Sequence, residues 1–276
     1  MNPVFIVLWG GPGSIKSTIA ASMAVHGKLG WHSFDVGGDS RARWPKSAVE
    51  PHVTTLPAPN RLKLAKKRVN LEGWKELWET HLNALSDDLE DPDIFGIVFD
   101  TGTRQWVACH RAYLQLKQET AVAAGKSAPD GLIQIEYGEV NPWMFEVLDA
   151  PKNAGKHLIV TMHDEEDRHE ELVKGQLESV VIKARDGSVV MKPQGFRHIA
   201  KNADLMIHMV LNPMTNKPEG IITKAGMGDT QLTGMVVPEP TFDKLLALCE
   251  AAGKLAEAGK PIPGEYGKLM VESMKL

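Results

Sequence analysis

The sequence predicts an α/β fold in which helices cover both faces of a mainly parallel sheet. Apolar runs bounded by turn residues alternate along the chain with segments of helical periodicity, and this alternation is typical of sheets covered by helices. The continuous apolar run Ile94–Phe99 suits a strand that is buried on both faces, as in a parallel sheet. Asp186-Gly187, between the strand-forming segments Val180–Arg185 and Ser188–Lys192, predicts a β-hairpin insertion.

The composition is that of an ordinary globular protein. With 276 residues, of which 43% are hydrophobic and 24% charged, the chain suits one large domain or two small ones, and global disorder is excluded. The net charge of −4 argues against a protein that coats nucleic acid or an anionic membrane through bulk charge, although it allows a local basic groove. Two cysteines are too few for a disulfide framework, which favours a reducing, cytoplasmic setting.

The first apolar run, Val4–Trp9, bears on location and on fold. It is far shorter than the roughly 20 residues that a membrane span needs, and no Lys or Arg precedes it, so a secretory signal is not expected. We therefore expect a cytoplasmic protein. The run leads into Gly10-Gly11-Pro12-Gly13, as a buried strand leads into a glycine-rich turn.

The remaining elements follow from the same periodicities. The expected strands are Val4–Trp9, Trp31–Val36, His52–Leu56, Ile94–Phe99, His157–Met162, Leu205–Leu211 and Gly220–Lys224. Apolar residues at three- and four-residue spacing predict helices over 71–89, 106–114 and 140–148, besides a short one over 19–24. Gly125–Gly138, rich in Gly, Ser, Pro and Asp, predicts a mobile loop.

The C-terminal part of the chain predicts a closing helix. Apolar residues recur between Phe242 and Leu255, and no linker long enough to separate two domains is visible before them. We expect one core over residues 1–240, followed by a C-terminal helix and tail over 241–276.

Gly10–Ser17 is the most informative stretch because it matches the phosphate-binding loop G-x-x-x-x-G-K-S at every fixed position but one. In such a loop, backbone N–H groups of the turn converge on an anion. Lys16 is then expected to reach the β- and γ-phosphates of a nucleotide, and the Ser17 hydroxyl to ligate Mg²⁺. The expected nucleotide-binding residues are Gly10, Gly11, Pro12, Gly13, Ser14, Ile15, Lys16, Ser17 and Thr18.

Ile15 stands where the motif has glycine. A β-branched side chain beside the phosphates is expected to crowd the nucleotide or to restrict the turn. A degenerate loop that binds nucleotide weakly is therefore an open alternative. A chance glycine turn before a helix is another, which the preceding strand, the spacing and the Lys16-Ser17 pair disfavour.

Polar residues at the ends of two further strands are candidates to complete the site. Asp100 follows a buried apolar run and is expected to hold the water shell of Mg²⁺. Thr161 and His163 end another strand and are candidates to touch the γ-phosphate, because ligands bind beyond the carboxyl ends of such strands. A metal site is not expected at the three histidines that are spaced across this strand and an acidic loop, His157, His163 and His169.

Together these residues resemble those of the RecA-like branch of P-loop ATPases. More closely, the chain is similar to the small phage-encoded AAA-domain ATPases, a group that includes single-strand-annealing-type recombinases. The resemblance spans roughly residues 3–226 and is carried by Gly10–Thr18, Phe34–Gly38, Ile97–Asp100, Leu158–Glu165, Ala203–Leu205 and Ile221–Lys224. It implies a three-layer P-loop NTPase fold of RecA-like type, with ATP and Mg²⁺ as cofactors.

The resemblance also implies roles for individual residues. In that family the active site lies at a subunit interface of a ring or filament, and ATP turnover is coupled to DNA. Lys16 and Ser17 are then expected to bind phosphate and Mg²⁺, Asp100 to be the Walker B acid and His163 to be the sensor. Lys224 is expected to project into a neighbour's site. A homo-oligomer and single-stranded DNA are the implied partners.

The general base stays open at this point. The family often has Glu just after the second strand, where this chain reads Asp35-Val36-Gly37-Gly38-Asp39. Asp39 or Asp35 is then a candidate to orient water, and Glu139 is a further one. With Ile15 in the loop as well, slow hydrolysis is an alternative.

Two basic segments are candidates for DNA contact. Arg61–Arg68 is densely basic and is interpreted as a solvated helix face. The hairpin ranks higher because, by resemblance, mobile segments after the sensor strand meet DNA, and strand alternation places Lys183 and Arg185 on one face. The acidic segment Asp164–Glu171 before it would repel a nearby DNA strand. The candidate DNA-binding residues are Lys183, Arg185, Lys192 and Arg197.

The sequence therefore predicts a Mg²⁺- and ATP-binding, RecA-like ATPase that acts on single-stranded DNA in phage recombination or repair, in the host cytoplasm. One alternative is a P-loop kinase for a small molecule, in which arginines stabilise the transferring phosphoryl group. Its candidates are Arg41, Arg43, Arg104 and Arg111, and no lid motif is visible. The other alternative is a non-hydrolysing nucleotide-binding assembly protein, which Ile15 and the open general base motivate.

Overall fold

A computed structural model describes residues 2–35, 44–59, 62–65, 68–173, 176–225 and 232–257. Within these ranges, one sheet has the strand order β14-β13-β12-β1-β7-β6-β2-β3. β13 (Pro218–Ala225) and β14 (Val236–Pro238) are its antiparallel edge. The other strands are mutually parallel: β1 (Phe5–Trp9), β2 (Lys28–Ser33), β3 (His52–Thr55), β6 (Ile94–Asp100), β7 (His157–Met162) and β12 (Leu205–Leu211). The predicted mainly parallel sheet is confirmed.

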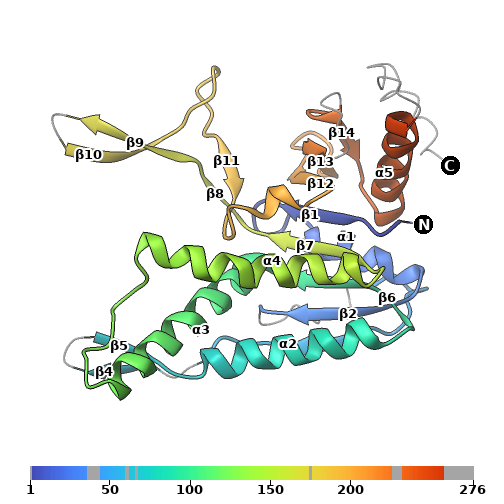
Figure 1. Cartoon of the computed structure of the whole chain (residues 1–276). Helices are drawn as coiled ribbons and strands as arrows, with labels where there is room; N and C mark the ends of the chain where they lie inside the picture. The colour runs from blue at the N-terminus through green and yellow to red at the C-terminus, as the bar shows by residue number, and fades with distance from the viewer. Residues whose placement is uncertain are drawn as a thin grey trace.

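Helices cover both faces of this sheet (Figure 1). α2 (Trp74–Glu90), α3 (Gly102–Ala123) and α4 (Tyr137–Asn153) pack on one face. The other face carries α1 (Lys16–Ala21), the 3₁₀ turn η1 (Ser22–Val25) and α5 (Phe242–Glu257). The predicted three-layer α/β fold is therefore confirmed.

Alternation along β1 explains why the sheet needs both layers. Phe5 and Val7 belong to the core beneath α2, α3 and α4, whereas Ile6 and Leu8 belong to the core beneath α1 and α5. All four side chains are almost fully buried. A strand that is apolar on both faces is stable only when each face is covered, and this is the reason for the continuous apolar run in the sequence.

The strand order brings the candidate residues to one edge of the sheet. β7 lies between β1 and β6, and β2 follows on the far side of β6. In register, Asp100 at the end of β6 lies beside Thr161 of β7 and beside Ser33 of β2. The loop after β1 opens at this same carboxyl edge, because Trp9 lies beside Met162.

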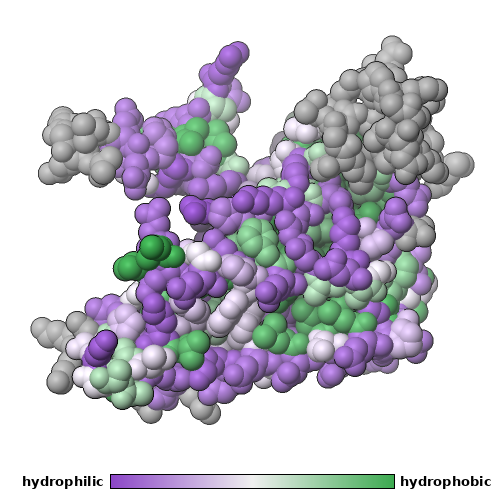
Figure 2. Space-filling model, in the orientation of Figure 1, coloured by the Kyte–Doolittle hydropathy of each residue, from purple (hydrophilic) through white to green (hydrophobic). Residues whose placement is uncertain are grey.

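Residues 164–193, which we call the arm, leave the sheet after β7 and stand away from its body (Figure 1). β8 (Asp164–Glu166) pairs with β11 (Met191–Pro193), and β9 (Arg168–Val173) pairs with β10 (Gln176–Val181), both antiparallel. The visible surface of the arm is mostly hydrophilic (Figure 2). A short 3₁₀ helix, η4 (Ile199–Lys201), follows the arm and precedes β12.

The predicted hairpin turn at Asp186-Gly187 is confirmed, but the strand before it is not the one predicted. Gly187 has a φ of 84°, and the Ala184 N–H donates to the Ser188 carbonyl across the turn. Val180 and Val181 instead pair with His169 and Arg168 in the β9–β10 hairpin. The predicted segment Val180–Arg185 is thus divided between two hairpins of the arm.

Other boundaries need correction. The helix predicted over Arg61–Arg68 is wrong, because β4 (Leu62–Ala65) and β5 (Arg68–Leu71) form an antiparallel pair there. Apolar residues of this segment recur at every second position, which is the strand period. The predicted loop Gly125–Gly138 is shorter, since the 3₁₀ helix η3 (Gln134–Glu136) and then α4 begin inside it. β2 begins at Lys28, earlier than the predicted Trp31, and Val36 lies outside the described residues.

The described helices include none that is both long and apolar enough to cross a membrane.

Candidate functional site

Two glycines give the turn between β1 and α1 its shape. Gly10 has a φ of 148°, and a Cβ at this position would lie 2.4 Å from the Met209 carbonyl oxygen. Gly13 has a φ of 77° with open space around it, so its conformation alone favours glycine. The Ser14 hydroxyl closes the turn by donating to the Gly11 carbonyl at 2.8 Å. The sequence-predicted loop is therefore present between a buried strand and a helix.

Lys16 is buried inside this loop. Its Nζ donates to the carbonyl oxygens of Gly10 and Gly11, each at 2.8 Å, and to the Ser14 hydroxyl at 2.9 Å. Burial lowers the pKa of the Lys16 ammonium, and the negative charges of Asp164 and Asp100 oppose that shift. The ammonium is thus held by oxygen acceptors that an anionic ligand is able to replace.

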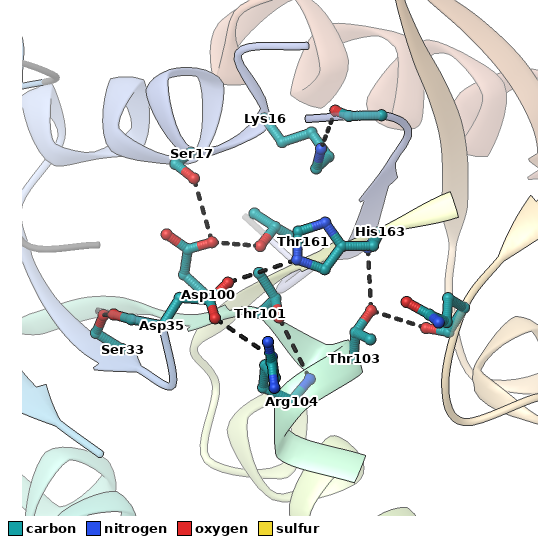
Figure 3. Close-up of polar contacts among 12 residues, drawn as sticks. Lys16, Ser17, Ser33, Asp35, Asp100, Thr101, Thr103, Arg104, Thr161 and His163 are labelled. Atoms are coloured by element: carbon teal, nitrogen blue, oxygen red, sulfur yellow. Dashed lines mark hydrogen bonds and ion pairs between the residues drawn. The ribbon is translucent and has the colours of Figure 1, made fainter. Parts of the chain in front are cut away.

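Ser17 and Asp100 meet at the carboxyl edge of the sheet (Figure 3). The Ser17 hydroxyl donates to Asp100 Oδ1 at 3.1 Å, and the Thr161 hydroxyl donates to the same oxygen at 2.5 Å. Asp100 is only 3% exposed, so its carboxylate depends on these donors in place of water. A hydroxyl beside a carboxylate is a donor set that suits Mg²⁺, a hard cation with oxygen ligands.

Asp35, two residues after the end of β2, is a second carboxylate at the site. The Phe34 N–H donates to the Asp100 carbonyl at 2.7 Å, which fixes the chain just before Asp35. His163 Nε2 lies 3.5 Å from one oxygen of Asp35, and Arg104 Nε lies 3.4 Å from the other (Figure 3). The hydrogen bond from His163, supported by the Arg104 charge, lowers the pKa of Asp35 against the opposing effect of its partial burial. Asp35 is therefore held as a carboxylate between two nitrogen donors.

The structure separates the three candidates for the general base. Asp35 lies in the cluster just described, whereas Asp39 lies outside the described residues. Glu139 is in α4, where it accepts a hydrogen bond from the Tyr113 hydroxyl of α3, and the structure does not bring it to this cluster.

Two threonines after Asp100 belong to the site, and sequence reasoning missed them. The Thr101 side chain accepts from the Arg104 N–H at 3.3 Å and caps α3. The Thr103 hydroxyl bonds to the backbone of His163 and of Gln194. A threonine between a buried strand and a helix is a capping signal that would have indicated Thr101. The contacts of Thr103 depend on residues far away in sequence, so no local signal reveals them.

Ile15 adopts the backbone conformation that the missing glycine would favour. Its φ is 56° and its ψ is 22°, which is the left-handed region that a β-branched residue rarely adopts. The carbonyl of Ile15 accepts from the N–H groups of Thr18 and Ile19, so this conformation begins α1. The loop therefore forms with isoleucine at this position, and the backbone of Ile15 is strained.

Lys224 does not join this site. Its ammonium donates to the carbonyl oxygens of Ala200 and of Ala203, the second at 2.7 Å, and both precede β12 at the amino-terminal edge of the sheet. Burial lowers the pKa of Lys224. A role in a neighbour's site stays a prediction.

The four candidate DNA-binding residues differ in their surroundings. Lys183 and Arg185 are exposed, and within the described part of the chain neither has an ion-pair partner. Lys192 is 3.0 Å from the Asp167 carboxylate, which neutralises its charge. The Arg197 Nε donates to the His198 ring at 3.2 Å. No side chain of Arg61–Arg68 lies among those the structure describes.

A hollow of about 340 Å³ opens beside Asp35 and Arg104. Phe34, Leu56 and Trp74 give it apolar walls. The Arg111 guanidinium lies 5.3 Å from the centre of the Trp74 ring, and Arg41 and Arg43 lie outside the described residues. A larger apolar groove of about 550 Å³ between α2 and α4 lies away from the phosphate-binding loop.

A family model described as an AAA domain matches residues 2–243. The chain belongs to the AAA domain family. This places it among the P-loop ATPases. The match includes the phosphate-binding loop, Asp35, Asp100 and His163.

Comparison with solved and curated proteins adds little to this membership. Among solved structures, the crystal structure of the RadB recombinase matches with a TM-score of 0.47 and 10% sequence identity, covering 85% of this chain and 86% of that chain. No conclusion about activity follows from a likeness at this level. No curated protein gives a significant match.

Proposed function

We propose that this AAA-domain protein binds ATP with Mg²⁺ at Gly10–Thr18 and hydrolyses it, as a RecA-like ATPase that acts with single-stranded DNA in phage recombination or repair. The observation that carries the nucleotide part is the convergence of Ser17 and Asp100, 3.1 Å apart, beside the loop that buries Lys16. Two segments far apart in sequence, Lys16-Ser17 and Asp100, bring a cation, a hydroxyl and a carboxylate together at one sheet edge, and phosphoryl transfer requires such a set of groups.

Each residue of the site would have a separate role in hydrolysis. Lys16 would exchange its carbonyl contacts for phosphate oxygens, since both are oxygen acceptors within reach of one ammonium. Ser17 and Asp100 would hold Mg²⁺, which supplies positive charge against the phosphates when bound. Asp35 would orient the attacking water, with His163 and Arg104 holding its carboxylate. A carboxylate with a lowered pKa is a weak base, so we expect slow turnover.

Phosphate release from Mg·ATP by the purified full chain tests this proposal. Lys16→Ala and Asp100→Asn are each expected to lower kcat roughly 10²- to 10³-fold, because each removes a charge that acts on the transferring phosphoryl group. Lys126→Ala is the matched control, since this exposed lysine lies in the loop after α3. A wild-type rate in Lys16→Ala would contradict the assignment of the loop.

Nucleotide binding separates the proposal from its non-hydrolysing alternative. At a hundredfold excess over Kd, a ligand that binds only the folded state stabilises it by about 2.7 kcal/mol. Thermal unfolding with and without Mg·ATP therefore reports binding even when turnover is absent. Stabilisation without phosphate release would favour a nucleotide-binding assembly protein. The absence of both stabilisation and phosphate release would overturn the nucleotide site itself.

The DNA part of the proposal is supported by Lys183 and Arg185, two exposed cations just before the Asp186-Gly187 turn of the arm. Carboxylates elsewhere in the arm, such as Glu166 and Glu178, weaken the attraction, so we expect modest, strongly salt-dependent binding of a single-stranded oligonucleotide. The double variant Lys183→Ala, Arg185→Ala is expected to lose it, and Lys126→Ala to retain it. Binding that is equal in all three proteins would exclude this surface.

Oligomerisation is the remaining part of the proposal. Sedimentation of the full chain with and without Mg·ATP is expected to show a ring or filament that forms with nucleotide. A monomer under both conditions would contradict the expected subunit interface.

A small-molecule kinase is a second candidate, favoured by the hollow of about 340 Å³ that Asp35 and Arg104 border. In a kinase, a carboxylate there would accept the proton of the acceptor hydroxyl, and the guanidinium would stabilise the transferring group. Incubation with labelled ATP and a panel of nucleosides and sugars distinguishes the two. A kinase transfers the label to one acceptor, whereas an ATPase releases it as phosphate.

A further inference from the structure

Thr103 is a meeting point of three segments. It lies in the first turn of α3, and its side chain is buried, with 7% of the residue exposed. Its hydroxyl accepts the His163 N–H at 3.0 Å and donates to the Gln194 carbonyl at 2.8 Å (Figure 3). One hydroxyl thus uses its donor and one acceptor position on the backbone of two separate segments.

These two segments are the ends of the arm. The arm begins at Asp164, directly after His163, and it ends at Pro193, directly before Gln194. The ends also bond to each other, because the Gln194 N–H donates to the His163 carbonyl at 2.8 Å. Thr103 therefore holds both ends of the arm against α3.

Packing around Thr103 shows that this approach is close. Gly195 has a φ of 121°, and a Cβ there would lie 3.2 Å from the Cα of Thr103. Only glycine adopts this backbone conformation readily while leaving that space. The chain after the arm is therefore shaped to pass directly against the first turn of α3.

The same bond reaches the candidate catalytic cluster. The backbone of His163 is fixed by Thr103, and its imidazole lies 3.5 Å from the Asp35 carboxylate. Asp35 also contacts Arg104, which is the residue after Thr103 in α3. If His163 shifted relative to α3, the distance between His163 and Arg104 would change, and Asp35 could no longer keep both contacts.

We infer that Thr103 is a positioning residue whose hydroxyl anchors both ends of the arm and, through His163, sets the position of Asp35. The anchoring follows from the contacts alone, whereas the effect on turnover rests on the proposed ATPase function. The Thr103 hydroxyl thereby adds a side-chain connection between the site and the arm that carries Lys183 and Arg185, besides the covalent chain and the bond between Gln194 and His163.

Two substitutions isolate the hydroxyl. Thr103→Val keeps the shape of the side chain but leaves the His163 N–H and the Gln194 carbonyl without this partner. Thr103→Ser keeps the hydroxyl and loses only a methyl group. Thr120→Val is the matched control in the same helix, since the Thr120 hydroxyl bonds only to the Leu116 carbonyl of its own helix among the described residues.

Hydrogen exchange of the full chain tests the anchor without any activity. In Thr103→Val, amide exchange within 163–166 and 191–195 is expected to rise about tenfold, the effect of losing one buried hydrogen bond. Thr103→Ser and Thr120→Val are expected to match the wild type there. Unchanged exchange in Thr103→Val, or an equal rise across all of α3 in both valine variants, would overturn the anchor.

Steady-state ATP hydrolysis tests the positioning. Thr103→Val is expected to lower kcat about tenfold with KM unchanged, and Thr103→Ser to restore it, because the hydroxyl acts through His163 and not on bound nucleotide. Faster exchange of the arm with an unchanged kcat would overturn the positioning role. If the wild type itself releases no phosphate, the proposed function fails, and the exchange experiment still decides whether Thr103 anchors the arm.

Discussion

At Ile15, the residue that breaks the sequence motif is also the residue with the strained backbone. The left-handed conformation at φ 56° costs an L-residue roughly 1–2 kcal/mol, and a β-branched side chain makes it rarer still. Ile15 is 36% exposed, so its side chain is only partly packed against the rest of the protein. The fold therefore retains the turn of a phosphate-binding loop at an energetic cost that glycine would avoid.

Replacing Ile15 with glycine is expected to stabilise the protein. Relief of the strain outweighs the added freedom of glycine in the unfolded chain, so we expect a gain of about 0.5–1 kcal/mol. For a chain of this size, Tm would rise by about 2 °C, which thermal unfolding followed by circular dichroism measures.

Ile133→Gly is the control for this substitution. Ile133 is 63% exposed and has an ordinary φ of −86°, so glycine there only adds freedom to the unfolded chain and is expected to lower Tm slightly. Equal shifts in the two variants would show that strain at Ile15 is not the cause.

At the scale of the elements, a buried polar chain joins the α2–α3 layer to the strands of the site. His52 of β3 and His32 of β2 both bond to the Asp88 carboxylate of α2, at 2.6 and 3.1 Å. His32 Nδ1 lies 3.2 Å from His81 Nδ1, and His81 Nε2 lies 3.0 Å from the Gln105 amide nitrogen of α3. These hydrogen bonds thus join four elements, β3, β2, α2 and α3.

The tautomers in this chain follow from the donors. The Gln105 amide donates to His81 Nε2, so His81 carries its proton on Nδ1 and donates to His32 Nδ1. His32 then carries its proton on Nε2 and donates to Asp88. These bonds form when His81 is neutral, while the buried Gln105 Oε1 has no hydrogen-bond partner among the described residues. Burial lowers the pKa of His81 well below its usual 6.5.

The hydrogen-bonded arrangement around His81 predicts that the protein loses stability in mild acid. A histidine whose pKa is lower in the folded state binds protons preferentially in the unfolded state, so stability is full above pH 6.5 and falls below it. One such proton contributes up to about 1.4 kcal/mol per pH unit. The free energy of unfolding, measured with urea between pH 8 and pH 5, is expected to decline accordingly.

His81→Gln isolates this contribution from those of other histidines. Glutamine is able to accept from Gln105 and donate to His32 but does not titrate, so the slope below pH 6.5 is expected to be shallower. His169→Gln, in the exposed arm, is expected to leave the slope as in the wild type. An unchanged slope in His81→Gln would contradict the assignment.

At the scale of the whole molecule, two cores on opposite faces of one sheet hold the fold together. The second core depends on α5, whose Phe242, Leu245 and Leu248 are fully buried. The Phe242 ring meets those of Phe95 and His157 edge-on, with centroids 6.2 and 5.4 Å apart. The sequence led us to expect a core over residues 1–240 and a C-terminal helix and tail over 241–276. We propose that these two parts are stable only together.

Phe242→Ala tests this dependence. Removing a fully buried aromatic ring leaves a cavity and is expected to cost about 3–5 kcal/mol, a large fraction of the stability of a typical domain. Leu82→Ala, in the exposed part of α2, is expected to cost about 0.5 kcal/mol. Urea unfolding measures both, and similar losses would show that α5 is not part of the core.

Much of the fold was predictable because its signals are local. The parallel strands are short apolar runs such as Ile94–Phe99, and α2 shows a single apolar face, so each could be recognised from neighbouring residues. The arm was only partly predictable. Its turn at Asp186-Gly187 is a local signal, whereas the pairing of Val180 with His169 depends on which strands meet, and several pairings satisfy the same pattern.

The phosphate-binding loop was recognisable from the sequence alone, because the glycines of the turn, Lys16 and Ser17 all lie within the eight residues Gly10–Ser17. Asp100 was recognisable beside it as an acid at the end of a buried strand. The contacts of Asp35 with His163 and Arg104, and those of Thr103 with both ends of the arm, were visible only in the folded chain. The physical reason is that these contacts depend on strand order, and β7 between β1 and β6 brings together residues that no sequence spacing relates.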